Sequence, residues 1–149
     1  MNRQCLQLLG DFCARHALPA PEPDAHDHYL LGFDRVEVSL FEDLGKLYAL
    51  AEVASLPAAP DERERMIEKS CGYLFSCLYL DECILNLYTK QEKDYLILVT
   101  VITGTDPAAL DDFEQRLAAL VDRAEALAAH LAETPRTVAP GGGFTIFRP

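Results

Sequence analysis

The sequence predicts an α+β domain in which three helices accompany a mainly antiparallel, twisted sheet of five strands, in the order α-β-β-β-α-β-β-α. Three segments place apolar residues at steps of three and four, as one side of an amphipathic helix does. Five shorter segments alternate apolar and polar residues or are rich in β-branched and aromatic residues, which is typical of strands. Short turn segments between neighbouring strands favour antiparallel pairing.

The first predicted helix covers residues 3–17. Its apolar stripe contains Cys5, Leu6, Leu9, Phe12, Cys13 and His16. Pro19, Pro21 and Pro23 follow and prevent the helix from continuing. An apolar run over residues 29–33 then begins the sheet.

Residues 35–40 alternate polar and apolar side chains with period two, which predicts a half-buried strand. The turn sequence of residues 42–45 separates it from a third strand over residues 46–53. A second helix is predicted from Pro60, because a proline followed by two acidic residues suits a first helical turn.

Two further strands are predicted over residues 82–89 and 94–103, joined by a polar tetrapeptide and paired antiparallel. Asp106–Pro107 is a strong helix start, because the carboxylate caps free N–H groups and proline suits the first helical position. The helix that follows is predicted to run to about Glu133.

The chain of 149 residues has the size of one domain, which we place at residues 1–134. Residues 135–149 form a predicted Gly/Pro-rich tail with a flexible linker at Pro140–Gly143. Two interpretations of the tail stay open: it is disordered, or its segment 144–147 is an arm that docks on an exposed strand edge.

The net charge of −11 makes nucleic acid and anionic membranes poor partners, and a basic or neutral protein a better one. The start of the chain lacks the apolar region of a signal peptide, and no segment approaches the length of a membrane span. Five cysteines without a Cys-x-x-Cys pair argue against a disulfide framework and a zinc knuckle. We therefore expect a soluble cytoplasmic protein with reduced thiols.

The predicted third, fourth and fifth strands carry apolar residues on both faces, whereas a sheet with one solvated face would alternate. Two amphipathic helices can cover only one of these faces. We therefore expect the second helix and the other sheet face to be covered by a second subunit or by a bound protein. The alternative is a monomer whose core the short second helix closes.

The cluster Asp24–His28 places two imidazoles and two carboxylates within five residues, which are groups that bind divalent metals. Because the cluster lies in a proline-bounded loop without a distant partner motif, we favour a solvated acidic linker and predict no metal site. No nucleotide-binding, nucleophile-elbow or zinc-protease motif occurs, and the cysteines lack basic neighbours. We expect no catalytic residue and no cofactor, hence no enzyme.

The order of elements and several local patterns resemble the class I type III secretion chaperones, the CesT/Tir chaperone family. The resemblance covers residues 4–133. It is carried by the Leu6–Leu9 helix ending at Ala17–Pro19, the Tyr29–Asp34 strand, the Leu47–Ala49 strand closing at Leu56–Pro57, and the helix from Asp106 with Leu110, Phe113, Leu117 and Leu127. The glycine-rich tail departs from the family pattern.

The resemblance implies a homodimer that binds the N-terminal chaperone-binding segment of a secreted effector, keeps it extended and soluble, and delivers it to the secretion apparatus and its ATPase. It places the second helix at the dimer interface, which points to Met66, Ile67, Ser70, Cys71 and Leu74. An extended segment would add to a sheet edge and insert apolar side chains into patches. The candidate effector contacts are Leu9, Phe12, Leu31, Phe33, Phe41, Tyr48 and Leu50.

Two other interpretations stay open. The chain could be a small acidic adaptor that binds a folded partner outside secretion. It could also be a small enzyme, for which His16, Tyr29 or Cys83 would have to converge in a pocket between sheet and helix.

Overall fold

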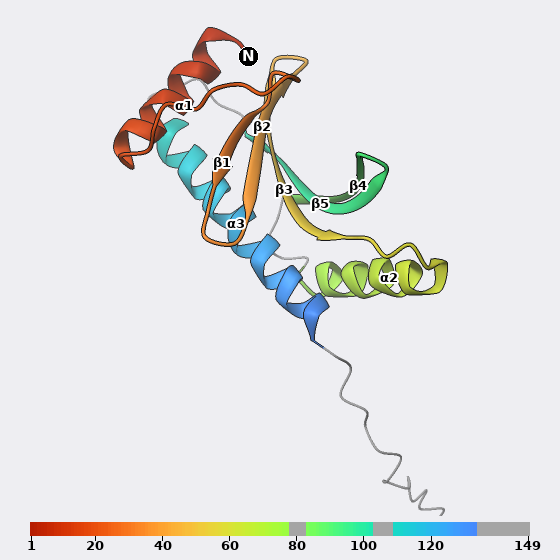
Figure 1. The fold of residues 1–149 in the computed structure, drawn as a ribbon. Coiled ribbons are helices and arrows are strands. Elements are labelled where there is room, and N and C mark those ends of the chain that lie inside the picture. Colours follow the sequence, from red (N-terminus) through yellow and green to blue (C-terminus); the bar gives the residue numbers. More distant parts are fainter. Residues whose placement is uncertain (78–82, 103–108, 134–149) are drawn as a thin grey trace, which may run out of the picture.

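A computed structural model of the chain describes residues 1–77, 83–102 and 109–133 (Figure 1). Its elements are α1 (Arg3–Arg15), β1 (Tyr29–Gly32), β2 (Glu37–Asp43), β3 (Lys46–Ser55), α2 (Pro60–Ser76), β4 (Cys83–Lys90), β5 (Lys93–Ile102) and α3 (Ala109–Ala132). The predicted α+β class and the predicted order of elements are confirmed. The predicted tail and the predicted helix start at Asp106–Pro107 lie outside the described residues.

The five strands form one antiparallel sheet in the order β1-β2-β3-β5-β4. The chain leaves β3 through α2 and returns to the far edge in β4, so that β5 occupies the place beside β3. The long β3–β5 pairing runs from Leu47–Ile102 to Ser55–Tyr95, with a register shift between Glu52 and Ala54. The two edge strands are therefore β1 and β4.

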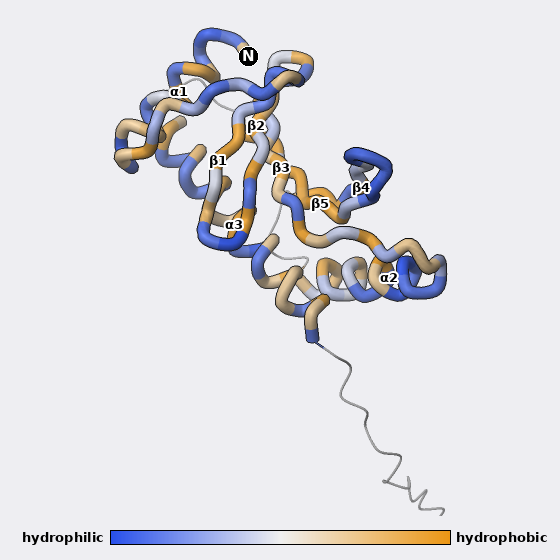
Figure 2. The backbone as a smooth tube through the Cα atoms, viewed as in Figure 1, coloured by the Kyte–Doolittle hydropathy of each residue, from blue (hydrophilic) through white to orange (hydrophobic). Residues whose placement is uncertain are grey.

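The hydrophobic core lies between one sheet face and α3. Strand residues that alternate along β2, β3 and β5 point into it, and α3 supplies its own stripe. The fully buried members include Val38, Leu40, Ala49, Ala51, Leu96, Leu98, Phe113, Leu120 and Leu127. Figure 2 shows the strands β3 and β5 as the apolar centre of the molecule. This period-two burial is what the sequence pattern predicts for the covered face.

The helices α1 and α2 pack at opposite ends of α3, as Figure 1 shows. Near the start of α3, the Arg15 Nη1 atom of α1 lies 2.7 Å from Asp111 Oδ1. After the end of α3, the Lys69 Nζ atom of α2 donates to the Glu133 carbonyl oxygen over 2.9 Å. All three helices therefore lie on the side of the sheet that faces the core.

The first helix begins and ends for local reasons. The Asn2 side chain accepts hydrogen bonds from the backbone N–H groups of Gln4 and Cys5, which caps the helix start. The helix ends at Arg15 rather than at residue 17, because Ala17 adopts a left-handed conformation with φ 53°. Across residues 1–77, 83–102 and 109–133, no helix has both the length and the apolar character needed to cross a membrane.

Candidate partner-binding surfaces

The sheet face that points away from α3 carries many apolar side chains, and no described helix lies over it. We call it the open face. Its apolar members are Leu30 of β1, Phe41 of β2, Tyr48 and Leu50 of β3, Ile84 and Tyr88 of β4, and Tyr95, Ile97, Val99 and Val101 of β5. Leu30 is 44% exposed, Ile84 63% and Tyr88 40%, whereas Ile97 is buried. The apolar surplus predicted for this face is present.

Three aromatic side chains form a stack at one end of the open face. The Phe41 ring lies 5.3 Å from the Tyr48 ring and 5.0 Å from the His28 ring, in stacked geometry. Phe41 and Tyr48 are cross-strand partners, and such pairs stabilise a sheet. The Ser39 hydroxyl lies 3.2 Å from His28 Nδ1 and holds the imidazole in place. Contacts within the chain therefore hold this stack in place without a bound partner.

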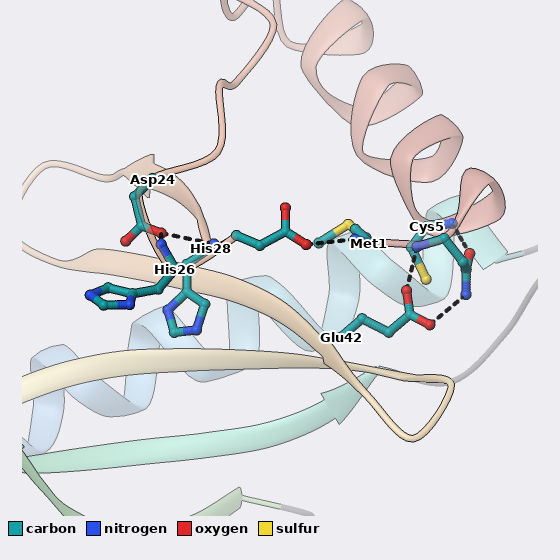
Figure 3. Close-up of polar contacts among 8 residues, drawn as sticks. Met1, Cys5, Asp24, His26, His28 and Glu42 are labelled. Carbon is teal, nitrogen blue, oxygen red and sulfur yellow. Dashed lines mark hydrogen bonds and ion pairs between the residues drawn. The ribbon is translucent and has the colours of Figure 1, made fainter.

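The segment Asp24–His28 is largely exposed to solvent, as favoured from the sequence, and it forms a hydrogen-bonded turn beside β1. The Asp24 Oδ1 atom accepts hydrogen bonds from the backbone N–H groups of His26 and His28 (Figure 3). These two donors hold the pKa of the Asp24 carboxyl below its ordinary value. Asp27 contacts the Met1 ammonium group at 2.9 Å, and Glu42 contacts Asn2 at the start of α1. Within the described residues, no group of three or more His, Cys, Asp or Glu side chains is placed to hold a metal ion.

A groove with a volume of about 420 Å³ crosses the open face between this turn and the tip of the β4–β5 hairpin. Its lining residues are Asp24, His26, His28, Leu30, Glu37, Ser39, Leu50, Glu52, Tyr88, Thr89, Lys90 and Gln91. The lining includes residues of both edge strands, so the open face is hollowed between its two edges. A volume of this size lies within the range of ligand-binding clefts.

The predicted effector contacts divide into two groups. Leu9 and Phe12 of α1 and Leu31 of β1 are 1%, 5% and 5% exposed in the core, so they offer a partner almost no surface. Their apolar pattern reflects packing against α3, as the edge-to-face contact of Phe12 with Phe113 shows. We leave these three out of the candidate surface.

The other four predicted contacts are partly exposed. Phe41, Tyr48 and Leu50 lie together on the open face, as the alternation of β3 predicts. Phe33 lies elsewhere, beside Val121 and Glu125 of α3, where it lines a separate hollow and packs against the margin of the core. The open face therefore brings together three of the seven predicted residues.

The predicted dimer-interface residues of α2 also differ in position. The Ser70 side chain is buried and its hydroxyl donates to the Met66 carbonyl oxygen over 2.7 Å. Ile67 and Leu74 pack against the margin of the core. Cys71 and Leu74 line a hollow of about 230 Å³.

This hollow lies between α2, β4 and α3. It is lined by Cys71, Leu74, Phe75, Cys77, Cys83, Leu85 and Arg123. Phe75 is 69% exposed, which is unusual for so large an apolar side chain. Sequence reasoning missed Phe75, although its i+4 spacing from Cys71 places both on one side of α2. We call Phe75 and the hollow beside it the α2–β4 surface.

The residues that an enzyme would require lie apart. Tyr29 is in β1 and Cys83 in β4, which are the two edge strands, and His16 lies 3.1 Å from Glu114 on the helical side. Burial raises the pKa of the Cys83 thiol, which disfavours the reactive thiolate. The three residues therefore form no common site.

Neither the comparison with protein-family models nor that with curated protein sequences finds a match. Solved structures do match. A chain of the ExsC–ExsE complex superposes with a TM-score of 0.63 at 23% identity, covering 88% of this chain and 97% of that chain. A chain of the HopA1–SchA chaperone–effector complex gives 0.59 at 13% identity, with coverages of 85% and 94%.

A third match comes from Yersinia pestis. It is a chain from the structure of the type III secretion chaperone SycH bound to a stable fragment of YscM2, with a TM-score of 0.51 at 20% identity, covering 81% of this chain and 97% of that chain. At these identities the likeness is one of fold. This chain therefore has the fold found in complexes of type III secretion chaperones, as its sequence predicted.

Proposed function

We propose that this protein is a type III secretion chaperone. It binds the N-terminal segment of a secreted effector in the bacterial cytoplasm, keeps that segment extended and soluble, and presents it to the secretion apparatus and its ATPase. The observation that carries the proposal is the open face. It is an apolar sheet face over which none of the described helices lies, in a fold shared with chains from chaperone complexes.

The shape of the open face favours an extended segment as the ligand. The groove is lined by side chains from four strands, and the aromatic stack of His28, Phe41 and Tyr48 borders it. An extended chain presents alternate side chains to such a surface and can add main-chain hydrogen bonds at a free strand edge. The edge strand β1, which contributes Leu30 to the groove and is bridged by Pro23 at Tyr29, and the edge strand β4 offer such edges.

A second part of the proposal is self-association through the α2–β4 surface. The exposed Phe75 lies beside a hollow of suitable chemistry, lined by Leu74, Leu85 and three cysteines. A two-fold axis would place Phe75 of each subunit against the hollow of the other, which is the self-complementary arrangement of an isologous dimer. This surface lies on the helical side of the sheet, so that self-association and effector capture use different faces.

The decisive experiment is purification of the tagged protein from its native host, followed by mass spectrometry of the co-purified proteins. We expect one or a few secreted proteins, held through an N-terminal segment, and their loss in the variant Tyr48→Asp/Leu50→Asp. Leu44→Asp is the matched control, because Leu44 is 90% exposed in the β2–β3 turn. Capture of a folded partner instead would support the adaptor interpretation. Unchanged capture by the double variant would exclude the open face as the effector-binding surface.

A further inference from the structure

Two acidic side chains of the open face lie next to each other. Glu37 of β2 and Glu52 of β3 occupy facing positions one step beyond the pair Val38–Ala51, and both line the groove. In the part of the chain that the structure describes, neither side-chain carboxylate has a hydrogen-bond or ion-pair partner. Like charges directly opposite each other on neighbouring strands destabilise a sheet. A cation placed between them would remove this repulsion.

The open face changes in character along these two strands. On β3, Tyr48, Leu50 and Glu52 are each two residues apart and point to the same side. On β2, Phe41 and Glu37 mark the same two ends. The surface is therefore aromatic at one end, aliphatic in the middle and acidic at the other end. The aromatic and acidic ends are about 13 Å apart, which is the length of four residues of an extended chain.

Carboxylate groups outnumber ammonium groups in the groove as a whole. Three carboxylates line it, those of Asp24, Glu37 and Glu52, against the single ammonium group of Lys90. These four groups together carry an excess of two negative charges. The whole chain carries −11, so an anionic occupant of the groove, such as a nucleic acid, is repelled.

We propose that the groove recognises a basic side chain within the extended segment it binds. An arginine or lysine of the partner lies between Glu37 and Glu52, while apolar side chains two and four residues away contact Leu50 and the Phe41–Tyr48 stack. This inference rests on the proposed function, since it names the chemistry of the segment that the open face captures. It also gives a role to two like charges on a largely apolar sheet face.

The test uses a labelled nine-residue peptide in which a central arginine is flanked on both sides by alternating serine and valine. The symmetric sequence presents valines two and four residues from the arginine in either direction. Its partner peptide replaces arginine by citrulline, which has nearly the same shape and no charge. Fluorescence anisotropy with the full-length protein measures both dissociation constants at low and high salt.

We expect the arginine peptide to bind about tenfold more tightly than the citrulline peptide, and the difference to shrink at high salt. Glu37→Gln/Glu52→Gln should abolish the difference while leaving citrulline binding unchanged. The control Asp122→Asn/Glu133→Gln removes the same charge from exposed positions on and just after α3 and should preserve the difference.

Equal binding of the two peptides by the native protein would overturn the inference, and so would a preference that survives in Glu37→Gln/Glu52→Gln. Failure of both peptides to bind at millimolar concentration would overturn it as well. The proposed function is judged separately, by co-purification from the native host. If the Tyr48→Asp/Leu50→Asp variant loses effectors there while the two peptides bind equally, effector binding by the open face is supported and recognition of a basic side chain is excluded.

Discussion

The two faces of the sheet are built from the same strands and differ in what lies over them. On the covered face, Leu40, Ala49 and Leu98 are fully buried under α3. On the open face, Leu30, Ile84 and Tyr88 remain substantially exposed, although their side chains are also largely apolar. Burial of apolar area is the main stabilising contribution to folding. The covered face therefore accounts for most of the stability of the fold, and the open face leaves apolar area exposed.

The difference shows how alternation along one strand can separate residues that form the core from residues available for the proposed binding. Successive side chains of a strand point to opposite faces, so each residue of β2 and β3 serves either the core or the open face. Substitutions at neighbouring positions should accordingly affect different measurements. Such substitutions therefore test directly whether the covered face and the open face have separate roles.

The largest expected effect compares the adjacent residues Leu40 and Phe41. Leu40→Ala leaves a cavity in the core and should lower the free energy of unfolding by about 2–5 kcal/mol. Phe41→Ala removes a partly exposed ring together with its stacking on His28 and Tyr48, and should cost less, about 1–2 kcal/mol. Urea denaturation of the two variants measures both values. If Phe41→Ala destabilised the fold as much as Leu40→Ala, the open face would be part of the core.

A second comparison separates the open face from the α2–β4 surface. Phe75→Asp places a charge where the proposed dimer buries an aromatic ring, and should weaken self-association about tenfold or more. Leu50→Asp lies on the open face and should leave the association constant unchanged. Sedimentation equilibrium of both variants measures the effect. A native protein that sediments as a monomer would contradict the proposed dimer.

The sequence predicted the fold well because each element depends on a local pattern. The alternation of β3 assigned Leu47, Ala49 and Ala51 to one face and Tyr48 and Leu50 to the other, as the structure has them. The order of strands depends instead on which strand pairs with β3. No local pattern in the sequence indicates that β5 pairs with β3 or that β4 lies at the edge of the sheet.

The candidate sites were less predictable for the same reason. The groove joins Glu37 and Glu52 with Tyr88 near the hairpin tip, and these meet only after strand pairing and sheet curvature are set. Leu9 and Phe12 show a different difficulty, because here the local pattern was recognised but its role was assigned wrongly. An apolar helical stripe has the same appearance whether it packs on its own core or on a partner, and here it packs on the core.

The smallest expected effect concerns the turn that borders the open face. Two backbone N–H donors lower the pKa of Asp24, so its carboxylate stabilises the folded state. This contribution is fully present above the ordinary carboxyl pKa of about 4 and is lost as pH falls through the lower pKa of the folded state. Asp24→Asn should therefore be less stable than the native protein at pH 7.

Urea midpoints of both proteins between pH 7 and pH 2.5 check this expectation, and the difference between them should narrow below about pH 4. Asp122→Asn is the matched control, because Asp122 is exposed on α3 and makes no hydrogen bond or ion pair within the described residues. A difference that stayed constant across this range would mean that Asp24 acts through something other than its charge. Because the turn positions His28 against Phe41, the same variant should also weaken binding at the aromatic end of the open face without changing self-association.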